Sequence, residues 1–444
     1  MDTRNAGGDH GASVLARVCG GTWIDPDDGG PIAAPPVRVE IARGVVARSR
    51  ELVGALDLGA RLGVVSDRTT HALAGAAIER ALAGTAAVAS IVLDADVAPD
   101  RAASQRLCDA CAGVDALVAV GSGTVNDLCK HVAATLGRPY AVFGTAPSMN
   151  GYTSTNAAIT VDGHKRSLPA TLARGVFLDL DILAAAPARM IRAGLGDSLC
   201  RSTAEVDWRL SHHLFGTPFR RAPFAMLAPD EALLLDDPAS LLSGDPQAME
   251  ALARTLVLSG LGMTLCGGSQ PASQGEHLVS HYVDMFAPAA RAAYLHGEQV
   301  AVATLALARL QARMLAAPAP RLNACAVDRA ALVARFGSEV GESCWDAFAP
   351  KALTPVRADA LSARLAAHWD TWRADLVAAA VGPARLEAAM AKAGVPRTPA
   401  AIGLDGEFFD DALQNARFLR DRYTFLDLAA DSQHRDLVNT KLAA

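Results

Sequence analysis

Short apolar runs alternate with helical patterns through the first part of the chain. The runs that predict strands lie at residues 62–66, 90–93, 116–120, 140–143 and 175–179. Residues 70–82 and 102–112, between these runs, have the spacing of amphipathic helices. Strands that alternate with helices are typical of a parallel sheet covered on both faces. We therefore predict an α/β fold for this part of the chain.

Beyond residue 181 the pattern changes to long segments rich in Ala and Leu. The segments with helical spacing are residues 188–213, 246–265, 297–315 and 361–379. Because β-branched runs are almost absent there, the second part is predicted to be all-α. We therefore expect two domains, an α/β domain at residues 1–185 and a helical domain at residues 186–444.

Composition and charge narrow the class of protein. Of the 444 residues 51% are hydrophobic, and the formal net charge is -6. Such a chain can bury a sizeable core, and it has no basic face for nucleic acid or acidic lipid. Its first residues lack the apolar core of a signal peptide, and the long uncharged stretches at 139–161 and 255–275 contain too many polar residues to cross a bilayer. We expect a soluble cytoplasmic protein without nucleic-acid or membrane partners.

The eight cysteines are scattered without regular spacing. This distribution argues against a disulfide framework and fits a reducing compartment. Cys108 and Cys111 form a Cys-x-x-Cys pair in a segment that reads as helical, and no second pair accompanies them. We interpret them as ordinary helix thiols rather than as a zinc or redox site.

A glycine turn after the run at 116–120 gives the first indication of a nucleotide. Gly121 and Gly123 would let backbone amides approach a pyrophosphate, and the following helix would present its positive N-terminal end. Asn126 stands where the Rossmann fingerprint has its third glycine, so this turn alone is a weak signal. A second segment rich in Gly and hydroxyl side chains follows the next strand, at 144–154. Together they predict a dinucleotide cradle at the carboxyl edge of the sheet.

Asp67 ends the strand predicted at 62–66. Its carboxylate could accept hydrogen bonds from an adenosine ribose and would then repel a 2′-phosphate. It could equally cap the helix that starts near Thr69. The sequence leaves both interpretations open.

One carboxylate and three imidazoles stand out in the helical part. His277 and His281 are four residues apart and would share one helix face, Asp197 follows Gly-Leu-Gly, and His296 precedes Gly-Glu. Each has an ordinary interpretation by itself: a helix N-cap for Asp197, a polar face for the pair, a helix end for His296. As a set they are plausible ligands for one divalent metal with an open coordination position. Such a metal would polarise the C–O bond of a substrate for a nicotinamide.

Seven motifs follow one another along most of the chain. They are Gly-Ser-Gly-Thr-Val-Asn-Asp at 121–127, Thr-Ala-Pro-Ser-Met-Asn-Gly-Tyr-Thr-Ser at 145–154, Gly-Leu-Gly-Asp-Ser-Leu at 194–199, Ser-Gln-Pro-Ala-Ser at 269–273, Glu-His-Leu-Val-Ser-His at 276–281, His-Gly-Glu-Gln-Val-Ala at 296–301 and Arg-Asp-Arg-Tyr-Thr-Phe-Leu-Asp-Leu at 420–428. In this order they resemble the sn-glycerol-1-phosphate dehydrogenase family. That family belongs to the superfamily of glycerol dehydrogenases, iron-containing alcohol dehydrogenases and dehydroquinate synthases.

The resemblance implies an α/β dinucleotide-binding domain, a helical domain and an active site in the cleft between them. It implies that zinc, nickel or iron is bound by Asp197, His277 and His296, and that His281 lies near the nicotinamide and the reacting carbon. It places NAD or NADP along Gly121, Ser122, Gly123, Asp127, Thr145, Ser148 and Ser154.

The chain departs from the family pattern at three positions. Asn150 stands where the family usually has an Asp close to the substrate and nicotinamide, Gln270 where an Arg is common, and Arg201 where a Lys is common. The loss of one negative and one positive charge near the cleft would leave the charges balanced while changing which substrate is held.

The resemblance implies reversible reduction of dihydroxyacetone phosphate to sn-glycerol 1-phosphate, a role in phospholipid metabolism, and a homo-oligomer. His281 or a water would supply the proton, and Lys165 and Arg166 would either contact the substrate phosphate or form a solvated pair. Three alternatives stay open: a dehydroquinate synthase-like lyase that uses NAD transiently, a dehydrogenase of another polyol or polyol phosphate, and a non-catalytic binding protein. Asp197, where the lyases commonly have Glu, favours a dehydrogenase.

Overall fold

The computed structural model describes residues 13–161, 164–287, 294–432 and 434. The first residues, on which the expectation of no signal peptide rests, lie outside this part. The main sheet has six parallel strands in the order β1-β8-β5-β4-β2-β3. These strands are β1 Arg38–Ala42, β2 Arg61–Asp67, β3 Ala87–Leu93, β4 Ala116–Gly121, β5 Tyr140–Gly144 and β8 Gly175–Asp179. The predicted parallel α/β sheet is confirmed.

Strands without a continuous apolar run were missed by the sequence pattern. β4 and β5, in the middle of the sheet, are buried at every residue and were predicted. β1 lies at the sheet edge, is half-buried throughout and alternates charged with apolar residues, so no strand was predicted there. A separate antiparallel hairpin, β6 Asn156–Val161 with β7 His164–Pro169, was also missed because it mixes apolar and polar residues.

Helices precede, connect and follow the strands of the sheet. They are α1 Val14–Cys19, α2 Ser49–Gly54, α3 Arg68–Thr70, α4 Ala76–Leu82, α5 Arg101–Ala110, α6 Gly123–Leu136 and α7 Leu180–Ala184. The helix predicted at 70–82 is divided, because a π-helical turn at His71–Gly75 separates α3 from α4. Cys108 lies in α5 and Cys111 directly after it, and all eight cysteines are free thiols.

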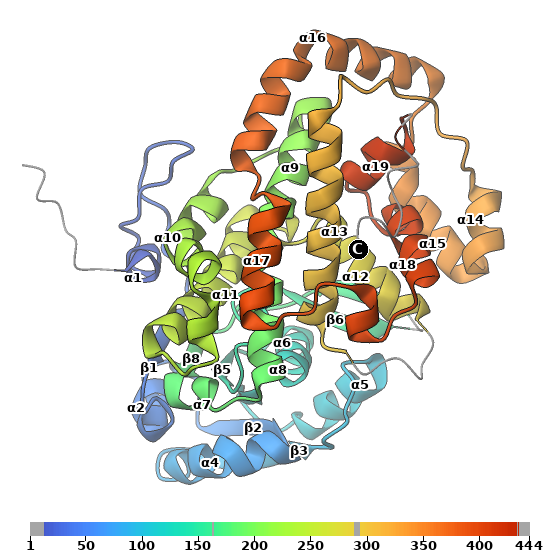
Figure 1. The fold of residues 1–444 in the computed structure, drawn as a ribbon. Coiled ribbons are helices and arrows are strands. Elements are labelled where there is room, and N and C mark those ends of the chain that lie inside the picture. Colours follow the sequence, from blue (N-terminus) through green and yellow to red (C-terminus); the bar gives the residue numbers. More distant parts are fainter. Residues whose placement is uncertain (1–12, 162–163, 288–293, 433, 435–444) are drawn as a thin grey trace, which may run out of the picture.

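Beyond β8 the described residues form helices and no further strand. The longer helices are α8 Ala188–Leu199, α9 Arg201–Phe215, α10 Ala222–Asp236, α11 Pro246–Cys266, α12 Gly275–Phe286, α13 His296–Ala316, α14 Arg329–Phe336, α15 Ser338–Phe348, α16 Pro355–Ala379, α17 Pro383–Ala393, α18 Gly406–Asn415 and α19 Phe425–Ala430. In Figure 1 the sheet with α4 and α5 forms the lower part of the molecule, and most of these helices form the upper part. The helix predicted at 188–213 is divided at Cys200.

One apolar core joins the two parts of the chain. It contains Leu117 and Val142 from the sheet together with Leu252 of α11 and Leu386 of α17. The domain boundary near residue 185 follows the last strand and stays a prediction. Among the described helices only α11 is long and apolar enough to cross a membrane, and 67% of its most apolar window is buried inside the protein. Packing in this core accounts for its apolar character.

Glycines bring helices α8 and α13 into backbone contact. A Cβ atom at Gly194 would overlap the carbonyl oxygen of Pro147, and one at Gly196 would overlap the carbonyl oxygen of Gly297. Helix α8 therefore lies directly on the loop after β5 and on the start of α13, where any larger residue would separate them. This contact brings Asp197, the residue after Gly196, beside the first turn of α13.

We expect Gly196→Ala to separate α8 from α13. The added methyl would overlap the Gly297 carbonyl and lie 2.8 Å from the Ala301 Cβ atom. Overpacking of this kind should lower the free energy of unfolding by about 1–3 kcal/mol, measured by urea denaturation. The matched control is Gly54→Ala, at the exposed end of α2 with no atom within 4 Å of the new Cβ. Equal stability of the two variants would contradict the backbone contact.

Candidate active site

The three predicted metal ligands come together from three helices. Asp197 lies inside α8, so the alternative that it caps a helix starting at Ser198 is wrong. His277 lies in the first turn of α12 and His296 is the first residue of α13. Their ligand atoms all lie within 4.8 Å of one another, and Asp197 Oδ1 is 3.6 Å from His277 Nε2. The fold therefore forms one compact group of potential ligands.

Each of the two imidazoles is oriented by a neighbour on its Nδ1 atom. His277 Nδ1 lies 3.0 Å from Glu276 Oε1, and His296 Nδ1 lies 3.2 Å from the Ser280 hydroxyl. The Ser280 hydroxyl in turn donates to Gln299 Oε1 at 2.6 Å. Partners of this kind fix the ring orientation of metal-binding histidines and leave Nε2 as the ligand atom.

Asp197 provides the test of whether a cation fits this group. It is fully buried, and its Oδ2 accepts a hydrogen bond from the Asn150 backbone N–H at 2.8 Å. Its Oδ1 is buried with no hydrogen-bond partner among the described residues. A buried carboxylate oxygen without a donor is rare unless a cation accompanies it. One carboxylate and two imidazoles fit zinc, nickel or iron with an open position.

The charges around the group also favour a cation. Burial lowers the pKa of His277, but the carboxylates of Asp197 and Glu276 outweigh burial and raise that pKa to about 9. Without a metal, His277 therefore holds a proton at neutral pH. Burial, with Lys165 as the next cause, lowers the pKa of His296 to about 4, so this ring is neutral and ready to act as a ligand.

A second group of possible ligands lies behind the first. Cys200 and Glu276 lie close enough to His277 to form one. Burial raises the pKa of the Cys200 thiol well above its usual value, and Glu276 accepts hydrogen bonds from the Thr203 hydroxyl and the Gln274 backbone. A thiol that keeps its proton and a carboxylate engaged by two donors make this group a support for His277 rather than a separate site.

His281 lies one helical turn beyond His277 in α12. Its ring centroid is 6.3 Å from the ring centroids of both His277 and His296. Arg420 Nη2 lies 3.3 Å from His281 Nε2. A guanidinium can only donate, so Nε2 accepts and Nδ1 carries the proton. Burial, and then the positive charges of Arg420 and Lys165, lower the pKa of His281 well below its usual value, so the ring is neutral.

The predicted nucleotide loops lie side by side at the carboxyl edge of the sheet. Gly121 ends β4 and Gly123 begins α6, with Ser122 between them. Thr145 follows β5, and its backbone N–H donates to the Gly121 carbonyl at 3.2 Å. The loop then continues through Ser148, which is half-buried. A helix N-terminus between two such loops is suited to bind a pyrophosphate.

Asp67 caps a helix. Its Oδ1 accepts from the Thr70 backbone N–H at 2.8 Å, while the Thr70 hydroxyl accepts from the Asp67 backbone N–H at 3.0 Å. The capping interpretation is therefore observed. A role of Asp67 toward a ribose stays a prediction.

Lys130 is a fully buried cation that the sequence did not single out. Its Nζ donates to the carbonyls of Gly151 at 2.8 Å and Asn156 at 2.7 Å, and to the Ser154 hydroxyl at 3.1 Å. It also pairs with Asp127 Oδ1 at 3.1 Å. Lys130 thus holds two predicted cofactor residues, Asp127 and Ser154, against the loop after β5. The i, i+3 spacing of Asp127 and Lys130 on one helix face could have predicted this ion pair from the sequence.

Many of the predicted residues line one cavity of about 240 Å³. The predicted residues that line it are Gly123, Asp127, Asn150, Ser154, Asp197, His277, His281 and His296. Gly121, Ser122, Thr145 and Ser148 are not among its lining residues. The Asn150 side chain is buried, and its Nδ2 has no hydrogen-bond partner among the described residues. Its amide can therefore donate to a bound molecule.

Two of the three departures from the family pattern lie outside this cavity. Gln270 lines a neighbouring cavity beside Gln274. Arg201 pairs with Glu205 at 3.0 Å and with Glu231 at 2.5 Å. Asn150 alone of the three lines the cavity that contains the metal group, so a charge exchange between Asn150 and Gln270 within one cleft has no support in the structure.

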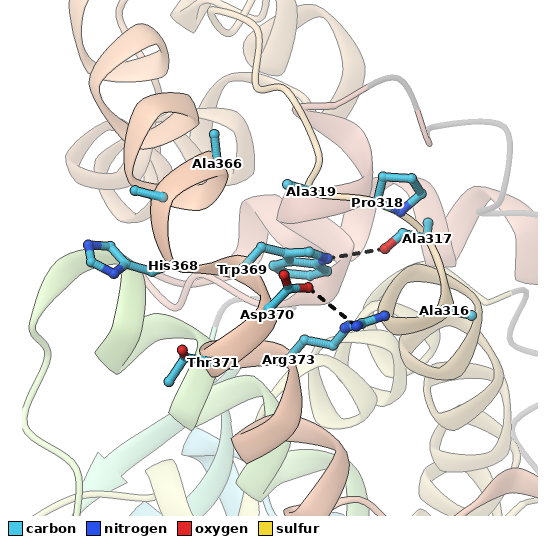
Figure 2. A pocket seen from close by; sticks show the side chains of 11 residues that line it. Ala316, Ala317, Pro318, Ala319, Ala366, His368, Trp369, Asp370, Thr371 and Arg373 are labelled. Atoms are coloured by element: carbon cyan, nitrogen blue, oxygen red, sulfur yellow. Dashed lines mark hydrogen bonds and ion pairs between the residues drawn. The ribbon is translucent and has the colours of Figure 1, made fainter.

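Another hollow lies between the end of α13 and helix α16 (Figure 2). Alanine side chains form much of its wall, and the Trp369 ring closes one side with its Nε1 donating to the Ala317 carbonyl at 3.1 Å. None of the predicted site residues lines it. The chemistry expected of this chain therefore belongs to the cavity that contains Asp197.

The chain is similar to known dehydrogenases. Residues 40–187 match the family model of the iron-containing alcohol dehydrogenases. The glycerol-1-phosphate dehydrogenase [NAD(P)+] of Bacillus licheniformis is 31% identical over 376 residues, which cover 83% of this chain and 82% of that protein. The enzyme of the same name from Pyrococcus horikoshii is 30% identical over 278 residues, covering 62% and 78% of the two chains.

Solved structures share the fold at lower identity. A probable glycerol dehydrogenase from Sinorhizobium meliloti 1021 superposes with a TM-score of 0.63 at 18% identity, covering 92% of this chain and 96% of that one. The glycerol dehydrogenase from Schizosaccharomyces pombe gives a TM-score of 0.60 at 17% identity, covering 92% and 90%. These likenesses establish the fold.

Metal binding should depend on pH through His277. Its pKa of about 9 means that a metal must displace a proton from it at lower pH. The apparent affinity for Ni²⁺ should therefore rise about tenfold per pH unit from pH 7 to 9 and then level off. Titration calorimetry in buffers of different ionisation enthalpy should show about one proton released per ion at pH 7.5. An affinity that stays constant from pH 7 to 9 would show that His277 is not protonated in the metal-free protein.

Lys130→Met should destabilise the protein. The methionine fills a similar volume but leaves Asp127 and two backbone carbonyls without their cation. Breaking a buried pair of this kind should lower the free energy of unfolding by about 3–5 kcal/mol, measured by urea denaturation. The control is Lys392→Met, at a site where the lysine makes one exposed hydrogen bond to the Asp236 carbonyl. A Lys130→Met protein as stable as this control would refute the role of the buried ammonium.

Proposed function

This chain belongs to the glycerol-1-phosphate dehydrogenase family, and on that premise we propose that it reduces dihydroxyacetone phosphate reversibly to sn-glycerol 1-phosphate with NADH or NADPH. The observation that carries the proposal is the group of Asp197, His277 and His296, which shares a cavity with His281 and with the first residue of α6. Ligands for a Lewis acid, a neutral imidazole and a phosphate-binding helix end are the parts that this reaction needs.

Asp197, His277 and His296 would hold one divalent metal, which supplies Lewis-acid polarisation of the carbonyl when it is bound. Glu276 and Ser280 keep the two imidazoles in orientation through their Nδ1 atoms. Burial of the three side chains strengthens their interaction with a cation, since little water competes there.

The cofactor would lie along the two loops at the sheet edge. Amides of Ser122 and Gly123 and the N-terminal end of α6 would bind the pyrophosphate, and Thr145 and Ser148 would lie along the second loop. Asp67, at the carboxyl end of β2, would repel the 2′-phosphate of NADPH, which favours NADH.

His281 is the proposed proton donor to the forming alcohol. Its Nδ1 carries the proton, and this atom is buried without a hydrogen-bond partner among the described residues. Because the ring is neutral, it would take up a proton at Nε2 as it gives up the one on Nδ1. A water is the other possible donor. Asn150 would donate from its amide to a substrate oxygen without taking part in proton transfer.

We also propose that the protein works in the cytoplasm as a homo-oligomer on a small phosphorylated substrate. The formal net charge of -6 supports a small-molecule substrate rather than a nucleic-acid or membrane partner. Sedimentation of the purified protein tests the oligomeric state.

An NADH oxidation assay tests the reaction. Dihydroxyacetone phosphate, dihydroxyacetone and glyceraldehyde phosphate are compared with and without added Zn²⁺ or Ni²⁺. We expect turnover of dihydroxyacetone phosphate that chelation abolishes and metal restores, because the metal polarises the carbonyl. Asp197→Asn should lower kcat/KM by about 100-fold or more, since it removes a ligand charge. The control Asp370→Asn changes a carboxylate that is 93% exposed and should leave kcat/KM unchanged.

Three results would contradict the proposal in different ways. Activity that survives thorough chelation would refute the metal role. Release of phosphate without net loss of NADH would indicate the lyase alternative. Turnover of an unphosphorylated ketone alone would overturn the substrate class.

A further inference from the structure

A second cavity adjoins the one that contains the metal group. It has a volume of about 300 Å³ and shares four lining residues with the first: Lys165, Ser167, His281 and Arg420. Its other walls include Arg166 of β7 and Ser343 of α15. None of the three proposed metal ligands lines it. The two cavities therefore meet at the wall that contains His281.

The second cavity is positively charged. Lys165, Arg166 and Arg420 line it, and none of its described lining residues has a carboxylate. Lys165 is already paired, since its Nζ lies 2.5 Å from Asp284 Oδ2. The interpretation of Lys165 and Arg166 as a solvated pair is therefore wrong for Lys165, while Arg166 is exposed. The positive charge that is not hydrogen-bonded to a carboxylate among the described residues comes from Arg166 and, deeper in the wall, from Arg420.

Arg420 has no carboxylate as a hydrogen-bond partner among the described residues. Its hydrogen-bond partner among the described residues is the neutral ring of His281, at 3.3 Å. Burial lowers the pKa of Arg420, an effect that the charge of Asp421 opposes. Since a guanidinium keeps its charge in proteins, an anion placed against it would regain the lost solvation. The planar fork of an arginine fits two oxygens of a phosphate.

We propose that this second cavity receives the phosphate group of the substrate and that Arg420 selects a phosphate monoester over an unphosphorylated ketone. The proposal rests on the function proposed above and names the residue that decides its substrate class. His281 lines both cavities, so a short carbon chain that reaches from the metal ligands to Arg420 passes this imidazole. The hydroxyls of Ser167 and Ser343 also line the second cavity and can donate to phosphate oxygens.

Arg420 therefore has two contacts in the substrate complex. One is with the phosphate, and the other is the donation to His281 Nε2 that leaves the proton on Nδ1. A substrate without a phosphate leaves the guanidinium unpaired, which lowers its binding without removing the proton donor. The ratio of activities on the two kinds of substrate thus reports on the phosphate contact alone.

The test compares kcat/KM for dihydroxyacetone phosphate and dihydroxyacetone in Arg420→Gln, Arg420→Lys and Arg166→Gln. Loss of charge-assisted hydrogen bonds should lower the ratio about 10- to 100-fold in Arg420→Gln, and less in Arg420→Lys, which keeps the charge but not the fork. Arg166→Gln, an exposed site, should lower it only about 2- to 5-fold. Arg329→Gln is the control, because that arginine is exposed and pairs with Glu342 away from the cavity.

Binding of inorganic phosphate gives a readout that does not need turnover. With NADH saturating, phosphate should bind to the wild type by calorimetry and compete with dihydroxyacetone phosphate, and Arg420→Gln should lose this binding. If the wild type does not reduce dihydroxyacetone phosphate, the proposed function fails, while phosphate binding lost in Arg420→Gln would still support the cavity. An unchanged activity ratio and unchanged phosphate affinity in folded Arg420→Gln would overturn the proposal. Should Arg420→Gln unfold, the same comparison in Arg420→Lys and Arg166→Gln decides.

Discussion

The buried carboxylate of Asp197, with one oxygen left without a hydrogen-bond donor among the described residues, is the constraint on which the site depends. An unpaired buried charge costs several kcal/mol, so the surrounding fold has to supply positive charge. Backbone contact between α8 and α13, which Gly196 and Gly297 permit, brings His296 to this carboxylate. His277 of α12 lies beside the same carboxylate and holds a proton that a metal would replace. Helix packing and metal binding are thus two parts of one electrostatic arrangement.

Two cations beside the cleft show that hydrogen-bond partners decide whether a buried charge stabilises the fold or is available to a ligand. Lys130 is fully buried, and its three donor directions and its charge are satisfied by carbonyls, a hydroxyl and Asp127. Such an ammonium has nothing left for a ligand and fixes the loop after β5. Arg420 lies in a cavity wall with a neutral imidazole as its hydrogen-bond partner. Burying a charge costs free energy at both residues. Protein groups offset this cost at Lys130, whereas a bound anion would offset it at Arg420.

The sequence predicted the elements that have a continuous apolar run and the residues that belong to a recognisable motif. Continuous apolar runs predicted β4 and β5, and the order of the motifs grouped Asp197, His277 and His296 before any geometry was known. Edge strand β1 and the hairpin of β6 and β7 were missed because their residues are partly exposed and mixed in polarity. Pairs such as Lys165 with Asp284, 119 positions apart, depend on tertiary packing. The spacing of residues along the sequence cannot predict them. Gln270 shows the opposite error, since a motif next to the site was taken to face it.

The charges along the cleft argue for one substrate orientation. Carboxylates gather at the metal end, where Asp197 and Glu276 flank His277, and cations gather beyond His281 at Arg420. An aspartate at position 150 would add a third negative charge at the metal end, whereas Asn150 offers an amide donor there. With a divalent metal in place the carboxylates at that end are neutralised, so the dianion of a phosphate is attracted to the cations beyond His281. The charge difference between the two ends therefore determines which carbon reaches the metal, and substrate selection and positioning follow from the same residues.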